Sequence, residues 1–283
     1  MMAGPFERHR WVTSEPEIPF ELGVLYEDER IIVVDKPHFL PTTPRGMWYR
    51  SSALMRLRER LGEPQITPAH RLDRATAGVL VFVRDPSVRA AYQMLFQRRQ
   101  VDKVYECLAP ARPLTTPATG TIARLAPPAP FPLLRRSYID KHPGHMQARE
   151  LRAQPNASTL IDLAGELPAF NLAGGRGNAT SSGPTFALDS SGGCLPGEGT
   201  TGRASTPYRA YRLHPYTGKT HQLRVHMASL GLPILGDDLY PIVINRPYDD
   251  FSHPLQLVAR SLSFTDPITG QPMRFQSRVP LCL

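Results

Sequence analysis

The order of its short apolar segments constrains the fold of this chain more than any other feature of the sequence. Segments with the composition or alternation of β-strands recur at 24–35 (two strands around a polar turn at 28–30), 78–83, 101–108, 208–213 and 255–264. Helices are predicted where capping residues precede apolar stripes, after Ser52, Asp85-Pro86 and Thr220. Because strands and helices do not alternate in a regular βαβ rhythm, the sequence predicts a mixed α+β fold.

The chain is expected to form a single domain over residues 22–283. Residues 1–21 contain three prolines and are predicted to be an irregular lead-in. Proline supplies 30 of the 283 residues, about twice the number expected from a typical share of roughly 5%, so long irregular connections are expected. A Gly/Ser-rich segment at about 165–207 would bury little apolar area per ordered residue, and we expect it to be a mobile insertion. It either joins two halves of this one domain or, as the alternative, separates two domains.

The charge of the chain favours a polyanionic partner. Lysine and arginine total 33 against 25 acidic residues, for a net charge of +8; RNA and DNA are the commonest partners of such a surface, although many basic proteins bind neither. No apolar run approaches the roughly 18 residues of a membrane span, and the N-terminal segment lacks the apolar core of a secretory signal. Three cysteines without paired spacing indicate a reducing cytoplasm. We expect a monomer, because no amphipathic repeat is sustained.

The densest polar cluster is the string His70-Arg71-Leu72-Asp73-Arg74. It is predicted to lie in a loop before the apolar strand at 78–83. An aspartate between two arginines stays ionised, because nearby positive charge lowers its pKa. Such a carboxylate can act as a nucleophile or general base, and the arginines can bind phosphate or stack between bases. The alternative is a surface ion-pair cluster, which is common for exposed charges.

A second polar cluster lies at 216–226, where Lys219, His221, Arg224 and His226 crowd the first turns of a predicted helix. A helix start with added cations suits an anionic ligand or a carboxylate partner. A nucleotide-binding P-loop is rejected, since the glycine it needs at position 213 is leucine. His221 and His226 are five residues apart, which disfavours a metal site on one helix face.

The strand at 101–108 carries a tyrosine with two possible interpretations. Alternation places Lys103 and Tyr105 on one face of this strand. Tyr105 is either a core residue, as partly buried tyrosines commonly are, or the aromatic platform of a nucleotide pocket.

Taken together, these segments resemble the RluA-type family of RNA pseudouridine synthases. The matching stretches are, in chain order, Glu27-Asp28 to Asp35-Lys36-Pro37, His70-Arg71-Leu72-Asp73 with Thr76 and Gly78, Lys103-Val104-Tyr105, residues 217–226, and residues 230–237 with Tyr240. Their order and approximate spacing agree over residues 22–112 and 205–265. Five such strings in one order are far more specific than any single motif.

The resemblance implies an α+β catalytic domain with a curved, mainly antiparallel sheet, flanking helices and a central cleft. It implies that the protein isomerises uridine to pseudouridine in ribosomal or transfer RNA, with Asp73 as the catalytic aspartate, Tyr105 as the active-site tyrosine and Arg224 as the arginine paired with the aspartate. Arg71 matches the position that enters the space of a displaced base. No metal and no organic cofactor are implied. We expect the neighbouring cationic side chains to bind RNA as well: His70, Arg74, Lys219 and His221.

The chain departs from the family pattern at three positions. The family often has serine, glycine and arginine where this sequence has Ala77, Phe39 and Lys219. None of these is the proposed aspartate, tyrosine or arginine, so they bear on which RNA is modified. A non-catalytic RNA-binding protein on the same scaffold and a hydrolase of N-glycosidic bonds are the alternative functions; the second would release free uracil.

Overall fold

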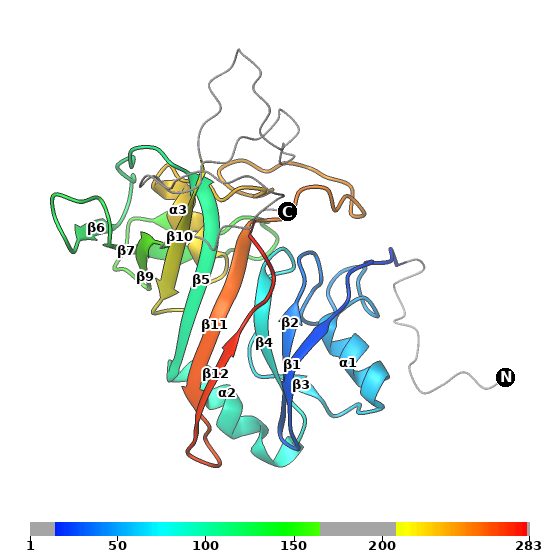
Figure 1. Cartoon of the computed structure of the whole chain (residues 1–283). Helices are drawn as coiled ribbons and strands as arrows, with labels where there is room; N and C mark the ends of the chain where they lie inside the picture. The colour runs from blue at the N-terminus through cyan, green and yellow to red at the C-terminus, as the bar shows by residue number, and fades with distance from the viewer. Residues whose placement is uncertain (1–14, 165–207, 282–283) are drawn as a thin grey trace, which may run out of the picture. The chain divides into compact units, whose positions relative to one another are not determined.

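The computed structural model describes residues 15–164 and 208–281, which form two compact units (Figure 1). The first unit comprises residues 15–103, 246–254 and 258–279, and the second comprises 104–164, 208–245, 255–257 and 280–281. The insertion predicted at 165–207 and most of the predicted lead-in lie outside the described residues. A single domain over 22–283 stays a prediction, and each unit is described by itself below.

The first unit is built on a twisted sheet with the strand order β1-β2-β4-β11, extended by β12 on β11 and by the short β3 on β4. These elements are β1 (Gly23–Glu27), β2 (Ile31–Lys36), α1 (Ala53–Leu61), β3 (Thr67–Pro68), β4 (Ala77–Val83), the 3₁₀ helix η1 (Pro86–Val88), α2 (Arg89–Gln97), β11 (Leu257–Thr265) and β12 (Pro272–Gln276). The predicted hairpin at 24–35 is confirmed, because β1 and β2 pair antiparallel. Its turn is closed by the Asp28 carboxylate, which accepts from the backbone N–H groups of Arg30 and Ile31.

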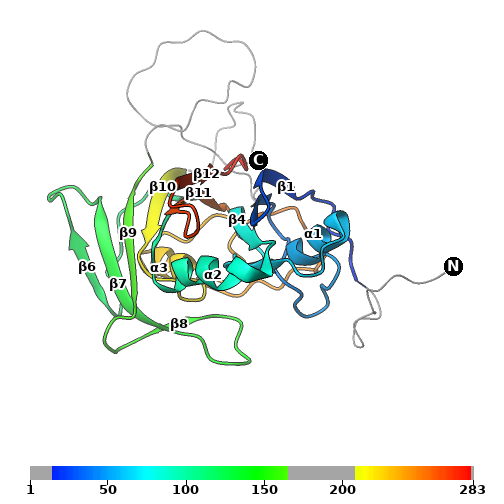
Figure 2. The same cartoon turned by 90° about the horizontal axis from the view of Figure 1, so that it is seen from below.

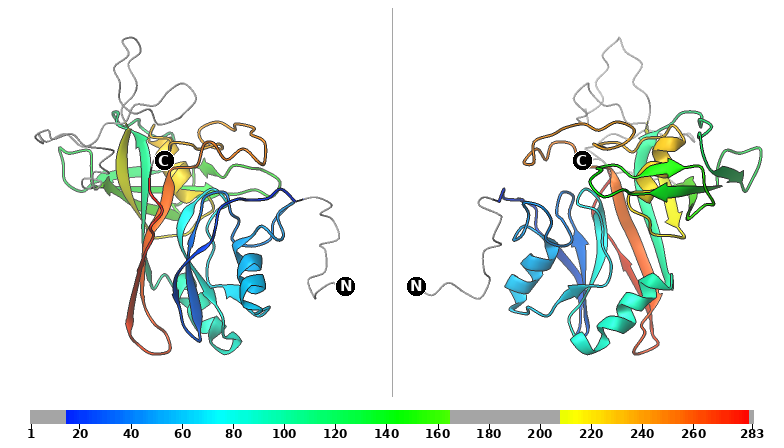
Figure 3. Two further views of the ribbon diagram at one scale, coloured as in Figure 1. Left: turned by 45° about the vertical axis from the view of Figure 1, so that its right-hand side comes forward. Right: turned by 180° about the vertical axis from the view of Figure 1, so that it is seen from behind.

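Strand β4 is the centre of this sheet, and every one of its residues is buried. It pairs antiparallel with β2 and parallel with β11. Gly78 lies on β4 with φ +114°, and a Cβ built there would stand 2.3 Å from the Ala259 carbonyl oxygen of β11. Glycine is therefore required for the two backbones to approach this closely. The turn between β11 and β12 lies at the far end of these strands from the loop that precedes β11 (Figure 3).

In the first unit, α1 begins where the sequence predicts, whereas α2 begins one turn later than predicted. Ser52 caps α1 by accepting from the Met55 N–H, and Gly62 ends it with φ +68°. Asp85 accepts from the Ser87 N–H, but the chain first makes the 3₁₀ turn η1 before α2 begins at Arg89. The apolar side of α2 packs through Tyr92 and Leu95 into the core formed by β4 and β11.

The second unit has an antiparallel sheet in the order β5-β10-β9-β7-β6, with β8 on β7. Its elements are β5 (Val101–Pro110), which belongs to this unit from residue 104, β6 (Thr121–Arg124), β7 (Leu133–Asp140), β8 (Arg149–Leu151), β9 (Ala157–Leu163), β10 (Tyr208–Pro215) and α3 (Gln222–Ser229). The sequence predicts β5 and β10 but not β6 to β9. Helix α3 lies against one face of this sheet, beside β9 (Figure 2).

Two boundary predictions are wrong. Thr220 does not cap the last helix: α3 begins after His221, which has a left-handed backbone (φ +56°) and makes no capping hydrogen bond with its side chain. The strand predicted at 255–264 begins at Leu257 and is followed by β12. Gly231 does end α3, with φ +76°.

Candidate active site

Asp73 lies in the loop between β3 and β4, and buried groups bind the backbone of this loop. The Thr42 hydroxyl accepts from the Leu72 N–H (3.1 Å) and donates to the Leu72 carbonyl (2.8 Å). The His38 Nδ1–H donates to the Ala75 carbonyl at 2.9 Å. These bonds bracket Asp73 on both sides, so the loop is ordered without regular secondary structure.

The ammonium group of Lys36 lies beneath the same loop. Lys36 is completely buried, and its Nζ donates to the carbonyl oxygens of Pro37 (3.0 Å), Leu40 (2.7 Å) and Arg74 (3.3 Å). An ammonium group has three N–H donors, and here each has a carbonyl partner. Burial lowers the pKa of Lys36 to about 7, and the charge of Asp73 opposes that shift.

The three neighbours of Asp73 that are predicted to bind RNA, His70, Arg71 and Arg74, have different surroundings. His70 faces the protein: its Nε2 accepts from the Val81 N–H at 3.2 Å, and its ring stacks on Phe96 with centroids 4.2 Å apart. Burial lowers its pKa to about 3, so the ring is neutral. Arg71 is exposed. The Arg74 guanidinium lies over the Trp48 ring, 4.2 Å from its centroid, and donates to the Tyr248 carbonyl at 3.1 Å.

In the second unit, Tyr105 is half-buried on β5 and pairs with Leu213 of β10. Residues directly opposite each other in an antiparallel pair share a face. Leu213 is fully buried, so Tyr105 lies on the inner face of this sheet. Its neighbour Glu106 lies on the other face, where Glu106 Oε1 is 3.7 Å from Arg212 Nη2.

Arg224 is buried on α3 and is bound by two aspartates. Its Nε donates to Asp237 Oδ2 at 2.9 Å, and its Nη2 donates to Asp237 Oδ1 at 2.5 Å and to Asp238 Oδ1 at 2.8 Å. The guanidinium also lies 5.4 Å from the ring centroid of Tyr240. Such a bidentate pair fixes the plane of the guanidinium. The sequence includes Asp237 in a matching stretch but gives no sign that it binds Arg224; the pairing of Arg224 with Asp73 stays a prediction.

The predicted RNA-binding residues Lys219 and His221 lie on the turn before α3. Lys219 is exposed, and its backbone N–H donates to Gln222 Oε1 at 3.1 Å. His221 Nδ1 is 3.0 Å from the Tyr240 hydroxyl. That hydroxyl donates to the Ala148 carbonyl, so it accepts from His221 and the proton of His221 lies on Nδ1. This hydrogen bond joins the His221 ring to Tyr240, which lies in the same segment as the aspartates that bind Arg224.

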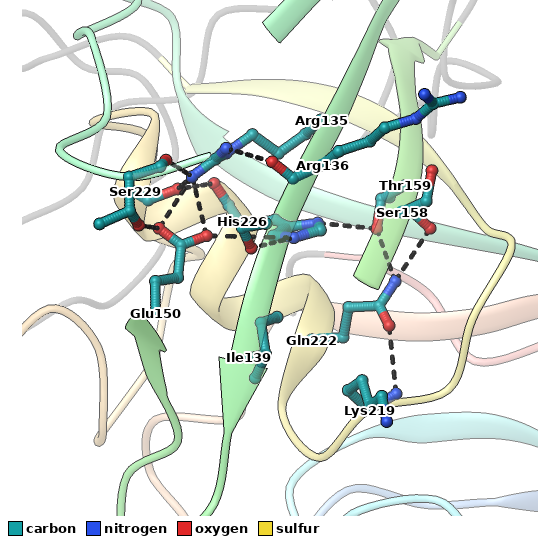
Figure 4. A network of polar contacts seen from close by, with 12 residues as sticks. Arg135, Arg136, Ile139, Glu150, Ser158, Thr159, Lys219, Gln222, His226 and Ser229 are labelled. Carbon is teal, nitrogen blue, oxygen red and sulfur yellow. Dashed lines mark hydrogen bonds and ion pairs between the residues drawn. The ribbon is translucent and has the colours of Figure 1, made fainter. Parts of the chain in front are cut away.

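Polar side chains of α3 continue into the unit's interior (Figure 4). The helix is buried from Gln222 to Met227, so these polar groups need partners. Gln222 Nε2 and His226 Nδ1 both bind the Thr159 hydroxyl, each at 2.9 Å. Burial lowers the pKa of His226 to about 3. Beyond it, the fully buried Arg135 donates to both carboxylate oxygens of Glu150 at 2.8 Å.

The described residues contain neither a metal-binding cluster nor a membrane-spanning helix. No group of three or more histidine, cysteine, aspartate or glutamate side chains there is arranged to hold a metal ion. None of the helices at 15–164 and 208–281 is long and apolar enough to cross a membrane.

Two solved structures share the fold of this chain. The chain superposes on human RNA pseudouridylate synthase domain containing 1 with a TM-score of 0.54 and 19% identity, covering 94% of this chain and 87% of that one. For human RNA pseudouridylate synthase domain containing 4 the TM-score is 0.51 and the identity 22%, over 91% and 88% of the two chains. These likenesses confirm the predicted α+β fold.

The sequence comparisons show the family. Residues 30–229 match the model of the family described as RNA pseudouridylate synthase. The chain is 27% identical to the dual-specificity RNA pseudouridine synthase RluA of Haemophilus influenzae, over 94% of this chain and 97% of that protein. It is 30% identical to RNA pseudouridine synthase 1 of Oryza sativa (91% and 72% covered) and 29% identical to tRNA pseudouridine synthase C of Vibrio cholerae (89% and 88%). The chain belongs to the RNA pseudouridylate synthase family. It is an RNA-modifying isomerase, and the predicted RluA-type resemblance is confirmed.

Proposed function

We propose that this enzyme converts uridine to pseudouridine in ribosomal or transfer RNA with Asp73 as its catalytic carboxylate. The observation that carries the proposal is the construction of the Asp73 loop, whose backbone is bound by the buried Lys36 ammonium and the Thr42 hydroxyl. A catalytic group must be held in one geometry, and buried hydrogen bonds of this kind supply that order. The names of the relatives, one of dual specificity and one acting on tRNA, support the two classes of RNA.

The reaction breaks the N1–C1′ bond of uridine, turns the uracil and joins C5 to C1′. The C5 proton is lost to solvent, and N1 gains a proton in its place. A uridine within a helix must first leave the stack, at a cost of a few kcal/mol. Asp73 acts at C1′ as a carboxylate, either by attacking it or by removing a proton after the glycosidic bond breaks. The uracil stays bound throughout, because its escape would leave an abasic site.

The other predicted residues receive roles that follow from their chemistry. Arg224 stabilises negative charge in the active site, and its orientation is set by Asp237. Tyr105 stacks on the uracil and accepts the C5 proton. Arg71 fills the space left by the flipped base, and Arg74 and Lys219 contribute positive charge toward the RNA. Direct RNA binding by His70 and His221, a cytoplasmic location and a monomeric state stay predictions.

Substitution of Asp73 by asparagine tests the proposal. Asp73→Asn preserves the size of the side chain and removes its charge, so we expect tritium release from [5-³H]uridine-labelled RNA to fall at least about 10³-fold, which is the loss of a catalytic barrier contribution near 4 kcal/mol. RNA binding, measured by filter retention, should remain within a few-fold of the wild type. Asp102→Asn is the matched control, since Asp102 is exposed on β5 in the first unit. Normal pseudouridine formation by Asp73→Asn contradicts the assignment, and release of free uracil by the wild type identifies a hydrolase.

A further inference from the structure

An exposed aromatic ring is held next to the Asp73 loop by a residue adjacent to that aspartate. Tyr248 is 60% exposed in the loop at 246–254. Its carbonyl accepts the 3.1 Å hydrogen bond from Arg74 Nη2, although the two residues are 174 positions apart in the chain. Its ring meets Trp48 edge-on, with centroids 5.3 Å apart. Trp48 in turn lies beneath the Arg74 guanidinium.

The sheet topology of the first unit explains why these two loops meet. β4 and β11 run parallel, so the segments that precede them emerge at the same end of the sheet. The Asp73 loop precedes β4, and the Tyr248 loop precedes β11. The turn after β11 lies at the opposite end (Figure 3).

The Tyr248 loop is held by contacts within the protein. Phe251 packs against Phe20 and Phe39, with ring centroids 5.4 and 5.2 Å away. The Asp250 carboxylate accepts from the Ser252 N–H at 3.0 Å and lies 3.6 Å from Arg246. A ring presented by an ordered loop loses little conformational freedom on binding, which favours its use as a contact surface.

Phe39 anchors this loop from a strained backbone position. Phe39 has a left-handed backbone with φ +65°, a conformation that disfavours residues other than glycine, asparagine and aspartate. The Phe39 ring packs against Phe251. The strained backbone therefore occurs at a residue whose side chain anchors the Tyr248 loop.

The surroundings of Tyr248 indicate a base as its ligand. Asp249 is exposed beside it, and a carboxylate repels a phosphate group. Aromatic side chains stack on unpaired bases in sequence-specific and sequence-tolerant RNA recognition alike, because every base has a π-face.

We propose that Tyr248 is a stacking platform for an unpaired nucleobase close to the reacting uridine. The inference rests on the proposed function, since it takes Asp73 as the point at which the RNA reacts. The platform supplies binding, not chemistry. Its loss should therefore raise KM and leave kcat near the wild-type value.

The experiment compares three variants in steady-state tritium release from [5-³H]uridine-labelled RNA of cells that lack the enzyme. Tyr248→Ala is expected to raise KM about tenfold, in the range measured for one base–aromatic stack. Tyr248→Phe keeps the ring and should stay within about twofold of the wild type. Ile268→Ala is the matched control: Ile268 is 48% exposed in the same unit, in the turn after β11, and should have no effect. Thermal unfolding of each variant checks that the loop is folded.

Each outcome decides between distinct conclusions. A wild-type KM for Tyr248→Ala overturns the platform while leaving the proposed function intact. Equal rises in KM for Tyr248→Ala and Tyr248→Phe also overturn it, because the hydroxyl and not the ring would then bind RNA. Absence of tritium release from the wild type is instead a failure of the proposed function.

Discussion

The Asp73 loop and the Arg224 helix hold their charged residues by different means. Around Asp73, Lys36 and Thr42 bind the backbone of an irregular loop. Around Arg224, Asp237 and Asp238 bind the side chain itself. The difference follows from secondary structure: a helix satisfies most of its own carbonyls, whereas a loop leaves them to other groups. A buried cation can therefore bind the free carbonyls of the loop. On the helix the backbone is already paired, so carboxylates bind the Arg224 side chain instead.

The largest effect is expected from breaking the pair on the helix. Asp237→Asn leaves the buried Arg224 without one of its two anionic partners, and removing one member of a buried pair costs about 3–5 kcal/mol. Asp238→Asn is the control, because its side chain is 40% exposed and an exposed pair contributes about 1 kcal/mol or less. Guanidinium chloride unfolding of both variants measures the difference. Equal losses would show that burial does not distinguish the two carboxylates.

A somewhat smaller loss of stability is expected from the loop. Lys36→Met fills similar space but leaves three carbonyls without their donor, of which each buried one costs roughly 1–3 kcal/mol, offset by the relief of burying an ammonium. We expect a net loss of about 3 kcal/mol and reduced activity, since the Asp73 loop loses its support. Lys141→Met, at a less buried lysine, serves as the control in the same unfolding measurement. A stable, fully active Lys36→Met enzyme would show that the order of the Asp73 loop does not depend on Lys36.

The histidines of the two units allow the comparison to be extended to pH. Burial lowers the pKa of both His70 and His226 to about 3, against 6.5 for an ordinary histidine. Between pH 6.5 and 3 the unfolded chain binds a proton that the native ring does not, so stability falls as the pH falls, by about 1.4 kcal/mol per pH unit for each ring. His226→Gln should reduce this slope by about one proton, as measured by urea unfolding at several pH values. The exposed His142→Gln variant should retain the wild-type slope; an unchanged slope for His226→Gln would mean that its ring is protonated in the native state.

The smallest effect concerns the starts of two helices. Ser52 caps α1 with its side chain, whereas α3 begins without a side-chain cap. Ser52→Ala should cost about 1 kcal/mol. Thr220→Ala should change the free energy of unfolding by only a few tenths of a kcal/mol, because surface substitutions away from such features are near neutral. A comparable loss of stability for both variants in thermal unfolding would indicate that Thr220 does cap the helix, as the sequence predicts.

Features encoded within a few residues could be predicted from the sequence. The Asp28 turn, the Ser52 cap with Gly62 and the buried strand β4 are of this kind, because capping, turn chemistry and apolar runs act locally. The family could be predicted as well, because five matching strings occur in one order along the chain. The sequence does not predict β6 to β9. Prolines and arginines obscure the alternation of β6 to β8, and β9 has the polar Thr159 at a buried position. Arg135 shows the reason: a charged residue occupies a core position on β7 because Glu150 neutralises it from β8.

By itself the sequence determined the short-range elements, the enzyme family and the identity of the candidate catalytic groups. Only the tertiary structure decided which groups bind them. Asp237 as the partner of Arg224, Lys36 beneath the Asp73 loop and Tyr248 beside Arg74 all depend on contacts between separate segments. The last of these arises because two parallel strands bring their preceding loops to one end of a sheet. No local pattern contains that information, because the residues concerned are neighbours only after the chain has folded.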